Sequence, residues 1–166
     1  MPESIKKDEL QRRLDSLIPV SDLTMNPKSA TSNIDVYIKS ENMLSLSLDT
    51  NNISFDDFSG VEDVEKLNAL NVTVSSSLPY ELNAYLVTEI QNSDKSNVMD
   101  KQILNIKESS DIDYKTFANV NDKIILKDNN TAGNDKIHPI DIKLKGNIAH
   151  KKDVYKATIK FEAQQK

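Results

Sequence analysis

Cysteine and tryptophan are both absent from the 166-residue chain, and glycine occurs only at Gly60, Gly133 and Gly146. Without cysteine the chain cannot form a disulfide bond, a thiolate zinc site or an iron–sulfur cluster, and it has no thiol nucleophile. Three scattered glycines cannot build the glycine-rich loops that hold nucleotide phosphates. The composition therefore excludes several large classes of redox, metal and nucleotide chemistry.

Long apolar runs and an excess of positive charge are lacking as well. No run approaches the roughly 20 apolar residues that cross a bilayer, so we expect no membrane span. The formal net charge is −5, whereas a dedicated nucleic-acid binder needs clustered lysine and arginine, so we expect no nucleic-acid partner. The charged first residues are not followed by the apolar segment of a secretory signal. This pattern predicts either a cytoplasmic protein or one whose signal has been removed.

The N-terminal part, residues 1–33, reads as a short helix followed by a linker or arm. Apolar residues at helical spacing predict an amphipathic helix over residues 3–18, which Pro19 ends. Residues 20–33 are rich in Ser, Thr, Asn and Pro and have no sustained period, as is typical of a linker.

From residue 34 onward the apolar period becomes two, which is the repeat of a strand with one buried face. The predicted strands are residues 34–38, 44–48, 70–74, 82–90, 104–106, 123–126, 140–145 and 155–161. Asn-rich turns such as Asp128-Asn129-Asn130 and Gly133-Asn134-Asp135 replace the missing glycines, because Asn and Asp tolerate left-handed backbone geometry. Short strands without alternating helices predict a mainly β chain, an antiparallel Ig-like or fimbrial-like β-sandwich over residues 34–166, with the short N-terminal helix outside it.

Charge is uneven along the chain. Residues 41–100 hold eleven acidic residues and two lysines, a net charge of −9, whereas residues 101–166 hold thirteen lysines and nine acids, a net charge of +4. One interpretation is that the charge of the solvent-exposed strand faces differs by chance between these two regions. The other is head-to-tail attraction between subunits, which can produce a filament.

Candidate catalytic and metal-binding residues each have a simpler structural interpretation. His138 and His150 are twelve residues apart, His138 precedes Pro139 in an expected turn, and we interpret both as surface histidines. The stretch from Asp128 to Gly133 lacks an acidic ligand at the fifth and twelfth positions of a calcium loop, which favours an ordinary turn. Asp56 and Asp57 are adjacent, so on a strand they would point to opposite faces. We therefore predict no catalytic, cofactor-binding or metal-binding residue and no enzymatic activity.

Several runs together resemble the fimbrial-type and cell-surface β-sandwich domains of Gram-positive bacteria. They are Ile34-Asp35-Val36-Tyr37-Ile38, Leu44-Ser45-Leu46-Ser47-Leu48-Asp49, Ile53 to Gly60, Val72 to Ser77 before Pro79-Tyr80, and Asp153 to Phe161. The resemblance implies a secreted or cell-surface structural or adhesion subunit that acts through contacts between protein subunits. It also implies strand addition, in which a terminal segment completes the sheet of a neighbouring subunit. Residues 20–38 are the available donor, and the other interpretation is that they pack on their own domain.

Two alternatives from other classes stay open. One is a glycan- or peptide-binding adhesion module, although a chain without tryptophan supplies little aromatic surface for sugar stacking. The other is an accessory or inhibitor domain whose loops block a partner enzyme.

Overall fold

The computed structural model describes residues 27–166. The chain divides into two units, residues 1–39 and residues 40–166. In the described part of the first unit, residues 27–39, no helix or strand forms and every residue is exposed. The helix predicted for residues 3–18 lies outside the described residues.

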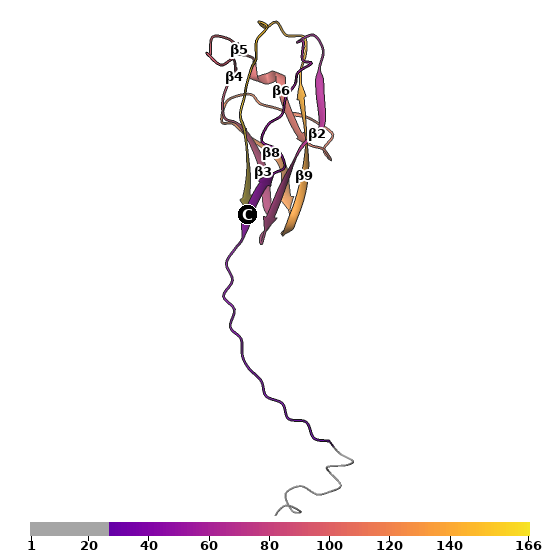
Figure 1. The fold of residues 1–166 in the computed structure, drawn as a ribbon, viewed down its shortest axis with the longest axis vertical. Coiled ribbons are helices and arrows are strands. Elements are labelled where there is room, and N and C mark those ends of the chain that lie inside the picture. Colours follow the sequence, from indigo (N-terminus) through magenta and orange to yellow (C-terminus); the bar gives the residue numbers. More distant parts are fainter. Residues whose placement is uncertain (1–26) are drawn as a thin grey trace, which may run out of the picture. The chain divides into compact units, whose positions relative to one another are not determined.

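The second unit consists of antiparallel sheets, which confirms the mainly β prediction (Figure 1). A five-stranded sheet has the order β1-β2-β9-β6-β7, a three-stranded sheet has the order β10-β3-β8, and β4 pairs with β5. The strand bounds are β1 Leu44–Leu48, β2 Val64–Ser76, β3 Tyr80–Leu86, β4 Ile90–Gln91, β5 Val98–Met99, β6 Leu104–Glu108, β7 Lys115–Thr116, β8 Lys123–Asn130, β9 Gly133–Leu144 and β10 Ile159–Gln165. A single 3-10 turn, Lys101–Ile103, precedes β6.

Residues 34–38 are not a strand in the structure, so this part of the strand prediction is wrong. Ile34, Val36 and Ile38 are 87, 71 and 84% exposed. An alternating pattern makes a segment able to form a strand, but only a neighbouring edge with free hydrogen-bonding groups makes it one. The first strand observed is β1.

Both larger sheets contribute side chains to one hydrophobic core. In β2 the buried residues alternate at Leu70, Val72 and Val74, so one face of that strand points inward. From the three-stranded sheet the fully buried residues Tyr80, Leu82 and Leu86 join the same cluster. β3 is the central strand of its sheet, and residues on both of its faces are buried over most of its length.

A β-bulge in β2 is held by a buried carboxylate. The pairing of β2 with β9 is interrupted between Lys66 and Leu70, and Asn68 takes a left-handed backbone with φ 49°. The Oδ1 atom of Asp141, on β9, accepts from the Asn68 backbone N–H at 2.8 Å and from the Ser109 hydroxyl at 2.5 Å. The carboxylate thereby satisfies donors that the interrupted ladder leaves free.

Candidate functional site

One buried polar group joins both larger sheets. Tyr80 Oη, on β3, and His138 Nε2, on β9, are 2.6 Å apart, and both residues are at most 6% exposed. The other imidazole nitrogen, Nδ1, is 3.9 Å from Glu108 Oε2 on β6. The Ser110 hydroxyl donates to Glu108 Oε1 at 2.8 Å, and Lys127 Nζ lies 3.5 Å from Oε2.

His138 is therefore not a surface residue, and this prediction is wrong. His138 and Pro139 lie in the middle of β9, where Pro139 is paired with Asn71, and not in a turn. The prediction failed because His138 is buried against Tyr80 of the other sheet, a contact that the local sequence around a histidine does not reveal.

The protonation of this group follows from its burial. Burial lowers the pKa of His138 from its ordinary value of 6.5, although the nearby Glu108 charge acts in the opposite direction. Burial, and secondarily Glu108, raises the pKa of Tyr80. With the proton of a neutral imidazole on Nδ1, facing Glu108, Nε2 accepts from the Tyr80 hydroxyl.

A carboxylate–imidazole–hydroxyl series resembles the arrangement that activates a nucleophile. Here the hydroxyl at the end of the series belongs to Tyr80, which is 0% exposed, so no substrate can reach it. The group connects β3, β9 and β6, which is a structural role, while Glu108 Oε2 makes only longer ionic contacts and has no hydrogen-bond partner.

His150 is half-buried and packs between aromatic rings. Its ring stacks on Phe58 at a centroid distance of 6.0 Å and contacts Tyr155 edge-on at 6.0 Å. A Cβ added to Gly60, which has φ +83°, would lie 2.6 Å from the His150 ring. His150 therefore packs directly over a glycine that no other residue can replace without strain.

The acidic candidates do not converge on one another. Asp56 and Asp57 are exposed in a turn, and Asp128 lies near the end of β8, where it pairs with Lys166 Nζ at 2.9 Å. In residues 27–166 no group of three or more His, Asp or Glu side chains is arranged to hold a metal ion.

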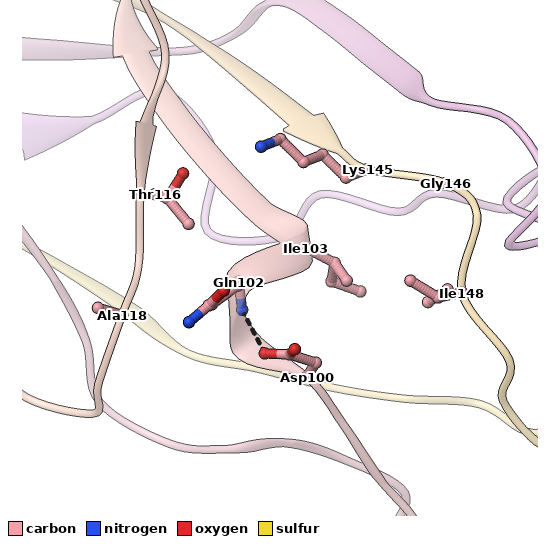
Figure 2. A pocket seen from close by; sticks show the side chains of 8 residues that line it. All are labelled: Asp100, Gln102, Ile103, Thr116, Ala118, Lys145, Gly146 and Ile148. Carbon is pink, nitrogen blue, oxygen red and sulfur yellow. Dashed lines mark hydrogen bonds between the residues drawn. The ribbon is translucent and has the colours of Figure 1, made fainter.

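A cavity of about 470 Å³ opens beside the 3-10 turn (Figure 2). Its lining residues are Asp100, Gln102, Ile103, Thr116, Ala118, Lys145, Gly146 and Ile148. Asp100 caps the turn by accepting from the Gln102 backbone N–H at 2.9 Å, and the Thr116 hydroxyl donates to Asn105 Oδ1 at 2.5 Å. The Asp100 carboxylate and the Thr116 hydroxyl are thus both hydrogen-bonded within the fold, and they form no nucleophile–base pair.

The remaining candidate is an interaction surface formed by residues 34–38, which we call the arm. Its three β-branched side chains, Ile34, Val36 and Ile38, are all more than two-thirds exposed and alternate with Asp35 and Tyr37. Exposed apolar side chains that share one face of an extended segment are a candidate contact surface for a partner. Of the donor stretch predicted over residues 20–38, residues 27–38 are described and are exposed.

No protein-family model matches the chain, and no curated protein matches it. Among the described residues, no helix has the length and apolar character needed to cross a membrane.

Proposed function

We propose that the protein is a non-enzymatic structural subunit of a bacterial surface or appendage assembly, and that its β unit is an Ig-like or fimbrial-like sandwich. The subunit acts through contacts with other copies of itself, outside the cytoplasm. The single observation that carries the proposal is the arm, a described segment that has the side-chain alternation of a strand, is exposed, and is assigned to no strand.

Strand addition is the contact that this segment supports. Main-chain hydrogen bonds to a sheet edge supply affinity, and alternate side chains entering an apolar surface supply specificity. The buried candidates support the same conclusion indirectly, because the Tyr80–His138–Glu108 group is closed to solvent, and the Asp100 carboxylate and the Thr116 hydroxyl beside the cavity are hydrogen-bonded within the fold.

The test replaces the apolar row of the arm and follows the mass of the assembly. We expect the triple variant Ile34→Ser, Val36→Ser and Ile38→Ser to be monomeric under conditions in which the wild-type chain forms ordered polymers. The measurement is size-exclusion chromatography with light scattering, followed by negative-stain microscopy. The arm lies outside the β unit, so circular dichroism of the variant should keep the wild-type β spectrum.

A matched control changes the alternate positions of the same segment. The variant Asp35→Ser, Tyr37→Ser and Lys39→Ser alters as many side chains and leaves the apolar row intact, so we expect it to polymerise. Polymers formed equally well by both variants would contradict the proposal. So would a wild-type chain that stays monomeric and binds a glycan or a peptide, a result that would favour the adhesion module instead.

A further inference from the structure

The imidazole of His138 has a different neighbour at each of its nitrogens, and only one of the two contacts is a hydrogen bond. Nε2 lies 2.6 Å from the Tyr80 hydroxyl oxygen, which is a hydrogen-bond distance. Nδ1 lies 3.9 Å from Glu108 Oε2, which is too long for one. All three residues are at most 7% exposed, so bulk water does not simply replace a partner that is lost.

The Tyr80 hydroxyl needs an unprotonated nitrogen on His138. In residues 27–166 its oxygen takes part in no hydrogen bond except the one with Nε2. A neutral imidazole with its proton on Nδ1 accepts the hydroxyl proton, whereas an imidazolium carries a proton on both nitrogens and can accept none. Protonation of His138 therefore leaves the O–H of Tyr80, which is 0% exposed, without an acceptor.

Glu108 offers the protonated ring a different partner. Its Oε2 atom is buried and has no hydrogen-bond partner in the described part of the chain. An imidazolium that moved by about 1 Å towards this oxygen would donate a charge-assisted hydrogen bond of about 2.8 Å from Nδ1. The same movement carries Nε2 away from Tyr80, because the two nitrogens point to different sides of the ring. The ring therefore has two exclusive arrangements, one for each protonation state.

The surroundings of the ring favour the neutral form. Burial is the largest effect and lowers the pKa of the imidazole from its ordinary value of 6.5. The charge of Glu108 on β6 acts against burial, whereas Lys136 on β9 and Lys127 on β8 act with it. Lys127 Nζ also lies 3.5 Å from Glu108 Oε2 and 4.0 Å from Asp111 Oδ1, so it compensates part of the carboxylate charge. β2, the other neighbour of β9, places the uncharged Val72 opposite the histidine.

We propose that His138 is an acid-sensitive connection between the two larger sheets. With a neutral imidazole it holds Tyr80 of the three-stranded sheet, and on protonation it releases Tyr80 and pairs with Glu108. β9 and β6 both belong to the five-stranded sheet, so the contact that is lost crosses between the sheets and the contact that is gained does not. Mild acid therefore weakens the attachment of one sheet to the other. The proposal concerns the β unit alone and does not depend on whether the chain polymerises.

The sign of the pKa shift gives the pH range of this effect. Because the pKa of His138 is lower in the folded chain than in the unfolded chain, the unfolded chain takes up the proton first as the pH falls below about 6.5. Stability is therefore lost as the pH falls through this value. Carboxylates ordinarily take up protons near about pH 4, so a change between about pH 7.5 and about pH 5.5 reports on imidazoles.

The first test compares the thermal midpoints at these two pH values, measured by circular dichroism. We expect the wild-type midpoint to be lower at the acidic pH by on the order of 2–5 °C. In His138→Gln the amide oxygen can still accept from Tyr80 but the side chain does not titrate, so this difference should disappear. His150→Gln is the matched control, because it removes the other imidazole of the chain, and it should keep the wild-type difference.

The second test follows the ring itself by NMR titration of the dilute wild-type chain. The chain has two histidines, so the His150→Gln variant assigns both imidazole signals. We expect His138 to titrate below 6.5. Its pKa should rise in Tyr80→Phe, because protonation no longer breaks a hydrogen bond, and should fall in Glu108→Gln, because the imidazolium loses its charged partner. Tyr85→Phe removes a hydroxyl that does not contact the ring and should leave the pKa unchanged.

Each outcome decides for or against the proposal. A pKa of His138 at or above 6.5 in the wild-type chain overturns it, and this result does not require any substituted chain to fold. A folded His138→Gln variant that keeps the wild-type difference in midpoint also overturns it. So does a folded Tyr80→Phe variant with an unchanged pKa of His138, because protonation then does not compete with the Tyr80 hydrogen bond. A midpoint difference that only His138→Gln removes, with the two opposite pKa shifts, supports the proposal.

Discussion

The contribution of the hydrogen bond between Tyr80 and His138 to stability depends on the burial of both residues. Removing a hydroxyl from a buried pair leaves the partner nitrogen without water to replace it. For Tyr80→Phe we expect a loss of about 1–3 kcal/mol in the free energy of unfolding, because His138 Nε2 loses its only hydrogen-bond partner in the described structure. Urea denaturation monitored by circular dichroism measures this change.

Tyr85→Phe is the matched control for this prediction. The Tyr85 hydroxyl donates to Glu162 Oε1 at 2.9 Å, but the side chain is only partly buried, so water can take the place of the lost partner. We expect a loss well below that of Tyr80→Phe. Equal losses in the free energy of unfolding would show that burial does not determine how much the Tyr80–His138 hydrogen bond contributes to stability.

At the scale of elements, the Glu81 carboxylate forms ion pairs across the three-stranded sheet. Glu81, in the central strand β3, is 4% exposed and lies 2.9 Å from Lys123 Nζ on β8 and 2.7 Å from Lys166 Nζ beyond β10. Hydrogen bonds from Lys166 and Lys123 lower the pKa of Glu81 from 4.5 to about 2. At pH values above the pKa of Glu81 in the unfolded chain, its ionised carboxylate therefore stabilises the folded state.

This shift predicts part of the acid sensitivity of the fold. As the pH falls from about 4.5 to about 2, the unfolded chain takes up a proton at Glu81 before the folded chain does, so the contribution of Glu81 to stability is lost over this range. We expect Glu81→Gln to lower the thermal midpoint at neutral pH and to make it fall less steeply between these two pH values. Glu89→Gln, whose carboxylate is 39% exposed beside Lys101, should change neither property. A wild-type slope in the Glu81→Gln variant would contradict the prediction.

The sequence predicted individual strands well and their surroundings poorly. Residues 44–48 are β1, and the predicted strands 70–74, 123–126 and most of 140–145 fall within β2, β8 and β9. Asn129 and Asp135 take the predicted left-handed backbone, with φ 54° and 49°, but they lie within β8 and β9, so the turns predicted at 128–130 and 133–135 are wrong. The last predicted strand began too early, since β10 starts at Ile159. Period two identifies a strand locally, because it depends only on alternate side chains.

Pairing depends on distant residues, and this is where the sequence alone failed. Residues 34–38 have the same alternation as β1, yet only β1 has an adjacent partner, β2. For the same reason the sequence could not place His138 beside Tyr80, which is 58 positions away. The incomplete burial of Leu44 and Leu48 on β1 is likewise a property of the assembled sheets and not of the strand itself.

At the scale of the whole molecule, the opposite charges of the two sequence halves lie within one fold. Ion pairs connect acids of residues 41–100 with lysines of residues 101–166: Glu89 with Lys101, Glu81 with Lys123 and Lys166, and Asp63 with Lys143. β2 and β9, one from each half, pair along most of their length. This arrangement leaves less charge for head-to-tail attraction than the linear sequence suggests.

Salt dependence therefore distinguishes apolar strand addition from attraction between charged ends. Raising the salt concentration from about 0.05 M to about 0.5 M shortens the screening length to a few ångströms and weakens contacts between exposed charges. It does not weaken the burial of Ile34, Val36 and Ile38 against a neighbouring subunit. We expect the critical concentration for polymerisation, measured by light scattering, to change less than about threefold over this range. Polymers that dissolve at the higher salt concentration would instead favour charge attraction between subunits, because only that contact is screened.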